Sequence, residues 1–178
     1  MTGRIDWEAL AGRLGLIEDD VDDGLVEDSG SDEARLALER ILGEDEMRAA
    51  VDHYVALRPG SELARSVLWL LHPGSAMLRC REIANSATDP EERRTAVELL
   101  RVVADRRALP WISDYLDDRD EGVQFWAIGI LDQLLRSELI EPEEAEGLLQ
   151  IADRHPNAQV REQAQFIRGF LADRATTE

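Results

Sequence analysis

The 178-residue sequence lacks lysine altogether and contains a single cysteine, so all twenty of its cationic side chains are arginines. The lone cysteine, Cys80, excludes an internal disulfide framework. No apolar run approaches the length of about 18 residues that indicates a membrane-spanning helix. Residues 1–20 also lack a charged region followed by an apolar core, so no signal peptide is expected. We therefore expect a cytoplasmic protein that does not span a membrane.

Alternation of apolar and polar residues, which is typical of half-buried strands, is also missing. Instead, Ala, Leu, Glu and Arg are abundant, and apolar residues recur every three or four positions, as in amphipathic helices. Hydrophobic residues make up 44% of the chain, which suits a folded protein rather than a disordered one. The length fits one continuous all-α domain with a sizeable core.

The formal charge of the chain is −18, and half of it lies in residues 1–33, which hold eleven acids and two arginines. Such a charge repels nucleic acid, because binding of a phosphate backbone depends on cationic side chains that displace counterions. It attracts a basic protein and steers its approach. The charge can equally serve only to keep the protein soluble. Because of its negative charge, we expect the chain to bind a basic protein and not nucleic acid.

Caps and helix breakers divide the chain into short helices. The first of these places Trp7, Leu10 and Leu14 on one face. Pro110 is expected to bend or restart its helix, whereas Pro142 fits a first turn, where its missing amide costs little. The expected helices span residues 6–14, 33–42, 45–57, 61–71, 74–86, 89–100, 106–117, 120–131, 142–154 and 157–171.

Three of these segments repeat one pattern around a small alanine. Each has Asp or Asn seven residues before the alanine, where the side chain can accept hydrogen bonds from the free amides of the first helical turn. The alanine lets a neighbouring helix approach closely, and a large apolar residue follows three positions later. The segments are DPEERRTAVELL (89–100, with Ala96), DEGVQFWAIGIL (120–131, with Ala127) and NAQVREQAQFIRGFL (157–171, with Ala164), and SELARSVLWLL (61–71) is a weaker copy with Val67 in place of the alanine.

This pattern resembles the HEAT-repeat family, in particular short bacterial repeats whose second helix has an Asp cap followed by valine, arginine and alanine. Val160, Arg161 and Ala164 fit it well, whereas the copy at Val123 lacks the arginine and the copy at Arg93 lacks the valine. The resemblance implies an α-solenoid of stacked helical hairpins. We expect repeats over residues 60–173, an N-terminal helical cap over residues 1–59 with an acidic loop at 18–33, and a tail at 174–178.

Residues that carry catalysis or bind metals are scarce. Of the histidines, His72 and His155 precede prolines at helix ends and His53 falls inside a helix, so structural roles are expected for all three. There is no HExxH motif, and the paired His-Glu dipeptides of iron-binding HEAT-repeat hydroxylases are missing. Cys80 shares an apolar helix face with Met77 and is expected to be a buried small hydrophobe. We expect no enzyme, no metal and no cofactor.

The acidic stretch EDDVDDGLVEDSGSDE (18–33) has nine carboxylates, the side chains that a calcium loop uses as ligands. An EF-hand loop needs glycine at its sixth position and oxygen ligands at its third and twelfth. With Gly24 at the sixth position, Val21 is third and Gly30 is twelfth, so two required ligands are missing. We expect instead a loop that joins the N-terminal helix to the repeats and serves as an electrostatic contact surface.

Stacked repeats of this kind bind proteins or peptides along their second helices. Trp69, Phe125, Trp126 and Phe166 lie in those helices. Phe125 and Trp126 are adjacent, so one helix face cannot hide both; either one of them contacts a partner, or both are buried between repeats.

The sequence therefore predicts a non-catalytic, monomeric protein-binding module. The resemblance extends to acidic HEAT-like immunity proteins, which implies an antitoxin that occludes the active site of a basic bacterial toxin. The alternative is an accessory or assembly factor for an enzyme complex. The predicted partner-binding residues are Asp19, Asp20, Asp22, Asp23, Glu27, Asp28, Asp117, Asp118, Asp120 and Trp126.

Overall fold

A computed structural model of the chain describes residues 17–20, 24–27 and 31–175. The predicted helix at 6–14 lies outside these residues. The described chain begins with two short strands, β1 (Ile17–Asp20) and β2 (Gly24–Glu27), which pair antiparallel with Ile17 opposite Glu27. A loop was expected over this acidic stretch, so that prediction was wrong for the two strands.

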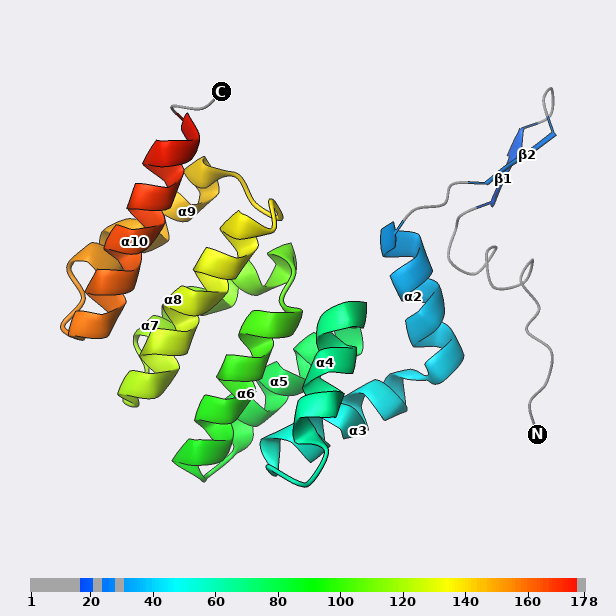
Figure 1. Ribbon diagram of the computed structural model, residues 1–178, viewed down its shortest axis with the longest axis horizontal. Helices are drawn as coiled ribbons and strands as arrows, with labels where there is room; N and C mark the ends of the chain where they lie inside the picture. Colours follow the sequence, from blue (N-terminus) through cyan, green and yellow to red (C-terminus); the bar gives the residue numbers. More distant parts are fainter. Residues whose placement is uncertain (1–16, 21–23, 28–30, 176–178) are drawn as a thin grey trace.

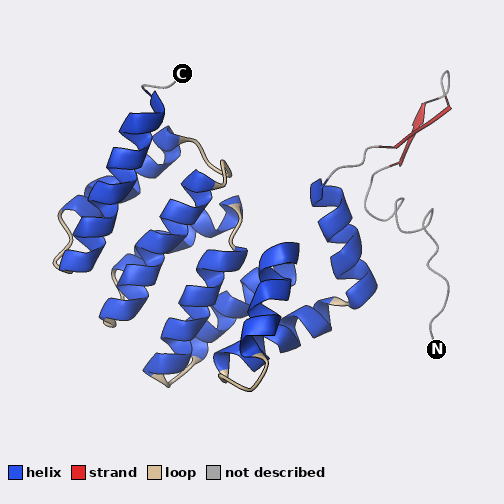
Figure 2. Cartoon of the chain, in the orientation of Figure 1, coloured by secondary structure: helices blue, strands red, loops and turns tan. Residues whose placement is uncertain are grey.

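Helices make up nearly all of the rest of the described chain (Figure 2). Their bounds lie within a few residues of the predicted ones, and the largest differences are at the C-terminal ends of α6, α8 and α10. The elements are α2 (Ser31–Leu42), α3 (Glu44–Val55), α4 (Ser61–Leu71), α5 (Gly74–Ser86), α6 (Pro90–Val103), the 3₁₀ helix η1 (Arg106–Trp111), α7 (Ile112–Leu116), α8 (Glu121–Arg136), α9 (Pro142–Asp153) and α10 (Ala158–Ala175).

The helices from α3 onward form hairpins that stack side by side (Figure 1). The first helices of the hairpins are α3, α5, η1 with α7, and α9; the second helices are α4, α6, α8 and α10. The first helices form one layer, which we call the first layer, and the second helices form the other. Successive second helices contact one another: α6 packs on α8, and α8 packs on α10. The predicted fold class, an α-solenoid of stacked hairpins, is confirmed. We call the surface formed by α4, α6, α8 and α10 the second-helix face.

The aligned alanines lie where the hairpins meet. Ala96, Ala127 and Ala164 are completely buried within one continuous apolar core. Their small side chains leave room for the large apolar residues of adjacent helices, such as Leu100 and Leu131, which are also fully buried. Val67, the counterpart in the weaker copy, remains partly exposed, because no second helix precedes α4 in the described chain.

The predicted caps also form. Asp89 accepts a hydrogen bond from the Glu91 amide at 2.9 Å, and Asn157 accepts one from the Gln159 amide at 3.0 Å. Each side chain satisfies an amide that has no partner inside its own helix. Pro110 lies inside η1, and α7 restarts two residues after it, as predicted.

Helix α2 is attached to the stack through a side chain that caps the N-terminus of another helix. The Glu39 side chain is buried and accepts hydrogen bonds from the amides of Gly74 (3.1 Å) and Ser75 (2.9 Å), and from the Ser75 hydroxyl. A carboxylate is favourable at this position, because the first turn of α5 presents free N–H groups and the positive end of the helix dipole. Glu39 therefore fixes α2 against the start of α5.

We predict that Ala127→Leu will lower the free energy of unfolding by about 1–3 kcal/mol, because extra methylene groups would overpack a fully buried position between helices. Urea denaturation followed by circular dichroism measures the change. Ala49→Leu, at an exposed position of α3, is the matched control and should change stability by less than about 0.5 kcal/mol. Equal stability of the two variants would contradict the assigned role of the alanine.

Candidate partner-binding surface

His53 and His155 have structural contacts in the described chain. His155 is buried, its Nδ1 accepts a hydrogen bond from the Asn157 amide (3.2 Å), and its Nε2 therefore carries the proton that is donated to the Leu116 carbonyl (2.8 Å). His53 Nε2 lies 2.9 Å from the Pro59 carbonyl oxygen. No group of three or more His, Cys, Asp or Glu side chains in the described residues is placed to hold a metal ion.

The Cys80 side chain is completely buried among apolar neighbours of α5 such as Met77, as predicted. Burial raises the pKa of its thiol far above the ordinary value, because the thiolate would lose its hydration. A thiol in this state is neither a nucleophile nor a metal ligand.

Asp118, one of the predicted contact residues, is engaged inside the molecule. Its carboxylate forms an ion pair with Arg93, and its side chain is only 11% exposed. Its Oδ1 also accepts a hydrogen bond from the Asp120 amide at 2.9 Å, while Arg93 Nε donates to the Ala84 carbonyl at 3.0 Å. Asp118 thus connects the turn before α8 to α5 and α6, and contact with a partner is not needed to explain it.

Asp120 has a similar internal role. It caps α8 by accepting hydrogen bonds from the amides of Gly122 (2.9 Å) and Val123 (3.0 Å). Arg94 of α6 donates to both of its oxygens, at 3.1 and 2.8 Å. A Cβ atom at Gly122 would collide with the Arg94 side chain, so this glycine makes the ion pair between repeats possible. The Arg94 guanidinium, together with the capped amides, lowers the pKa of the Asp120 carboxyl.

The two other predicted contact residues of this region differ from each other. Asp117 is exposed at the turn between α7 and α8. Trp126 is half-buried, and the Arg101 guanidinium lies over its ring at 5.3 Å from the centroid. A Cβ atom at Gly129 would lie 2.9 Å from Arg101 Cδ, so this glycine opens the space through which Arg101 reaches the indole.

The predicted contacts in the acidic stretch are only partly described. Asp19 and Asp20 lie in β1, opposite Leu25 and Gly24, and Glu27 ends β2 opposite Ile17. Asp22, Asp23 and Asp28 lie outside the described residues. The paired strands bring the two acidic halves of the stretch next to each other, and a partner-binding role for these carboxylates stays a prediction.

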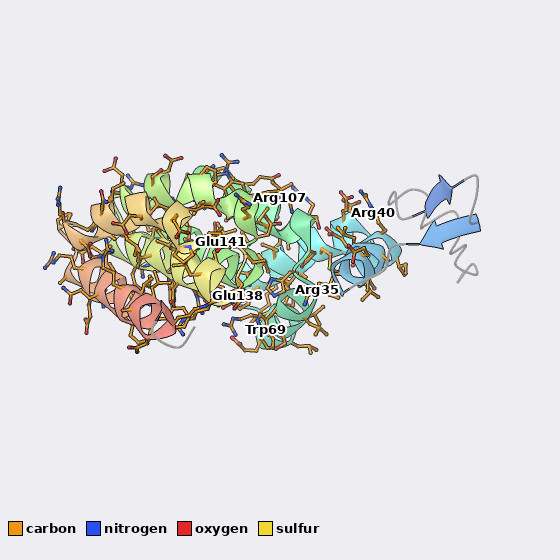
Figure 3. The ribbon with its side chains drawn as sticks, turned by 90° about the horizontal axis from the view of Figure 1, so that it is seen from above. Arg35, Arg40, Trp69, Arg107, Glu138 and Glu141 are labelled. Atoms are coloured by element: carbon orange, nitrogen blue, oxygen red, sulfur yellow. The ribbon has the colours of Figure 1, made fainter. Side chains whose placement is uncertain are left out.

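The largest exposed apolar side chains of the second-helix face lie on α4. Leu63 is 71% exposed, Leu70 is 68% exposed and Trp69 is 60% exposed. In Figure 3, Trp69 lies at the lower edge of the molecule, on the side opposite Arg107 of the first layer. Trp69 was singled out from the sequence, whereas Leu63 and Leu70 were not. With Val67 the two leucines have the spacing of a buried stripe, and they remain exposed because no second helix precedes α4 in the described chain.

Helix α4 is nevertheless firmly positioned. Glu98 of α6 accepts a hydrogen bond from the Tyr54 hydroxyl of α3 (2.5 Å) and lies 3.7 Å from Arg65 of α4. This network links α3, α4 and α6. At the opposite end of the same face, Phe166 of α10 is exposed beside Arg136 of α8, whose guanidinium lies 5.1 Å from the ring centroid.

Intramolecular ion pairs occupy many arginines of the described chain. They link neighbouring helices, as in Arg48 with Glu82 (2.6 Å), Arg106 with Glu144 (2.6 Å) and Arg168 with Asp153 (2.8 Å). Since acids outnumber arginines by 18, the remaining carboxylates give the molecule a negative potential. None of the described helices is both long and apolar enough to cross a membrane.

We predict that Asp120→Asn will lose the Arg94 ion pair but keep the cap, lowering stability at neutral pH by about 1 kcal/mol or less. Folding lowers the pKa of Asp120 below its ordinary value of 3.8, so its contribution is present above that pH and is lost as the pH falls through the folded-state pKa. The difference in unfolding free energy between wild type and variant, measured in urea from pH 6 down to pH 3, should therefore shrink towards the acidic end. A difference that does not change with pH would contradict this assignment.

We also predict that Cys80 will not react with Ellman's reagent in the native protein and will react at one thiol per chain once the protein is unfolded in guanidinium, because the native thiol is buried and protonated. Absorbance at the wavelength of the released thiolate measures the reaction. Rapid, stoichiometric reaction of the native protein would show that this helix is not packed as described.

A scan against protein-family models matches residues 80–169 to the family described as HEAT repeats. The match covers half of the chain, runs from α5 into α10 and contains all three aligned alanines. Searches of curated proteins and of solved structures return no significant match. HEAT repeats typically act as protein-binding scaffolds and not as catalysts. The chain belongs to the HEAT repeat family.

Proposed function

We propose that the protein is a non-catalytic binding protein for a basic partner, most specifically an immunity protein that neutralises a bacterial toxin by covering its active site. The observation that carries the proposal is the exposed apolar surface of α4, formed by Leu63, Trp69 and Leu70, on a strongly acidic molecule. A bound partner would cover this surface and would complement the charge.

The apolar part of the surface supports a specific contact. Exposed large apolar residues that cluster on a rigid element mark interaction sites, and tryptophan is the residue type most enriched among energetic hot spots. Trp69 stands on a helix that the Tyr54–Glu98–Arg65 network holds in place, so little freedom would be lost on binding. Burial of Trp69 would slow dissociation of the complex.

The acidic part of the surface supports rapid capture. The −18 charge raises the association rate of a cationic partner and discriminates against acidic proteins. Asp19, Asp20 and Glu27 of the hairpin and Asp117 of the α7–α8 turn are the proposed steering residues among those described. Asp118 and Asp120 are left out, because release from Arg93 and Arg94 would cost both an ion pair and a helix cap.

An inhibitor of this design works by occlusion. Toxins that act on nucleic acids need a cationic groove for the phosphate backbone, so a carboxylate surface placed over that groove competes with the substrate. No chemistry is required of the inhibitor.

The proposal is tested with the protein captured from the source organism by the immobilised chain. Expressed alone, the captured protein should stop bacterial growth, and co-expression of the wild-type chain should restore it. Trp69→Ala combined with Leu70→Ser should weaken binding by about 2–4 kcal/mol, mainly through faster dissociation, as measured by surface plasmon resonance.

Two sets of matched variants separate the apolar and the electrostatic contributions. Leu78→Ser removes an exposed apolar residue from α5 in the first layer and should leave affinity unchanged. Neutralising the acidic stretch should slow association by about tenfold at low salt, with a smaller effect at high salt; the same number of changes on first-layer helices should do less. The neutralised carboxylates are Asp19, Asp20, Asp22 and Asp23, and the controls are Asp45, Glu46, Asp114 and Glu143.

The proposal is wrong if the variants of α4 and of the acidic stretch bind with the affinity and salt dependence of the wild type. A captured partner that is harmless when expressed alone would contradict the immunity role and favour an accessory factor for an enzyme complex.

A further inference from the structure

Arg101 differs from the other arginines of the second-helix face. The helices α4, α6, α8 and α10 together carry eight arginines and eight carboxylates. Seven of these arginines lie within ion-pair distance of a carboxylate or donate to a backbone carbonyl, as Arg136 does to Asp132 at 2.9 Å. The guanidinium of Arg101 has no such partner among the described residues and lies instead over the Trp126 ring. Its charge is therefore not neutralised by a described carboxylate.

The hydrogen-bonding groups of Arg101 are also unused. Its Nε atom is buried and has no acceptor in the described chain. A buried donor without an acceptor is rare and costs free energy. The two terminal Nη atoms are not buried in this way and form no hydrogen bond in the described chain, so a bound molecule can reach them.

A glycine inside α8 makes room for Arg101. Gly129 lies in the interior of the helix, where glycine is destabilising relative to alanine. A Cβ atom at this position would lie 2.9 Å from Arg101 Cδ and 3.9 Å from Trp126 Cε3. The glycine therefore lets the Arg101 side chain lie against the indole, at a cost in helix stability.

Arg101 lies beside the exposed surface of α4. Arg65 of α4 and Glu98 of α6 face each other at 3.7 Å. Trp69 follows Arg65 by four residues, and Arg101 follows Glu98 by three, so each lies on the same side of its helix as the member of that pair which precedes it. The two helices are neighbours and run in the same direction (Figure 1). A partner that covers Trp69 therefore also meets Arg101.

We propose that Arg101 is the receptor for an aspartate or glutamate side chain of the protein that binds at α4. A guanidinium is planar and presents its N–H groups in a fixed fork, which matches the two oxygens of a carboxylate. Stacking on Trp126 holds that fork in place before the partner arrives. The inference rests on the proposed function, because it names a feature of the same partner.

A carboxylate at this point of a basic partner would supply the selectivity that net charge does not. The charge of −18 attracts basic proteins in general. Arg101 repels a candidate that places a lysine or an arginine opposite it, and it pairs with one that places a carboxylate there. The long-range field thus brings cationic proteins to the surface, and the local positive charge selects among them.

Surface plasmon resonance with the full-length chain and the captured partner tests the proposal. Arg101→Met removes the charge and keeps the length of the side chain. Arg81→Met is the matched control, because Arg81 lies over Trp111 at 4.2 Å from the ring centroid, in the first layer. Both substitutions make the chain more negative by one charge, so they change the long-range attraction alike. Arg101→Met should dissociate about tenfold faster or more, whereas Arg81→Met should dissociate as the wild type does.

The direction of the effect identifies the group opposite Arg101. A cationic group there would make Arg101→Met bind more tightly than the wild type, and a purely structural Arg101 would give the two variants equal affinity. Either result would overturn the proposal.

A double-mutant cycle then locates the carboxylate. Each Asp and Glu of the partner is replaced by Asn or Gln, and affinity is measured for the wild-type chain and for Arg101→Met. One replacement should weaken binding of the wild type about tenfold and have little further effect on Arg101→Met, because the same contact is already lost. Additive effects for every carboxylate of the partner would contradict the proposal.

Gly129→Ala guards against damage to the fold, because it keeps both Arg101 and Trp126. Its methyl group would displace Arg101 from the ring, while alanine favours the helix. Binding should weaken about threefold or more without a decrease in the midpoint of urea unfolding. Gly147→Ala of α9, whose added Cβ atom meets nothing within 4 Å, should bind as the wild type does. Wild-type affinity in Gly129→Ala would count against the assigned role of Arg101.

The growth assay decides the immunity role separately. A harmless partner whose binding depends on Arg101 and on one of its own carboxylates would refute immunity and support this inference. A toxin whose binding does not depend on Arg101 would support immunity and refute this inference.

Discussion

The close contact between successive second helices is the constraint on which the rest of the structure depends. Ala96, Ala127 and Ala164 have no exposed surface, and their size allows α6, α8 and α10 to lie against one another. No hairpin can bury its own apolar face, so each repeat becomes stable only through its neighbours. Once the helices stack in this way, Asp120 comes within reach of Arg94 and Arg101 comes to lie over Trp126. The polar contacts between repeats therefore follow from the apolar packing.

The same constraint explains where a partner would bind. In the interior of the stack each second helix is covered on both sides, whereas α4 is the first of its layer in the described chain and, besides α6, is contacted within reach of that layer only by α2, to a smaller extent. Its Leu63 and Leu70 are large apolar residues of the type that fills the core of the stack, but both are exposed. The end of the solenoid thus exposes apolar residues of a kind that the middle buries, on a chain whose net charge is −18.

Much of the fold was predictable because its determinants are local. Capping residues such as Asp89 and Asn157, the breaker Pro110 and the periodic alanines act within a helical turn, and they placed the helices within a few residues of their observed bounds. The division between a cap at 1–59 and the repeats stays a prediction. The site was less predictable, because exposure depends on which helices are neighbours. Partner binding by Asp118 and Asp120 stays a prediction, but the sequence did not show that Arg93 and Arg94, more than twenty residues away, form ion pairs with their carboxylates.

Two further features had no signal that could be interpreted from the sequence alone. The strands β1 and β2 lie in a stretch so rich in carboxylates that it suggested a loop, and their pairing depends on backbone hydrogen bonds that many sequences permit. Glu39 looked like an ordinary charged residue of an exposed helix, although it caps α5 from 35 residues away. Contacts of this kind depend on tertiary geometry, which helical periodicity does not encode.

The central claim is that a partner binds the second-helix face at α4. Hydroxyl-radical footprinting of the partner complex tests it most directly, because it reports the exposure of individual side chains without any substitution. Trp69 and Leu70 are exposed side chains whose protection can be followed. Leu78 of α5 and Ile151 of α9 are exposed apolar controls in the first layer. The account predicts that binding strongly reduces oxidation of Trp69 and Leu70 and leaves Leu78 and Ile151 unchanged. Protection of Leu78 and Ile151 with unchanged oxidation of Trp69 would contradict it.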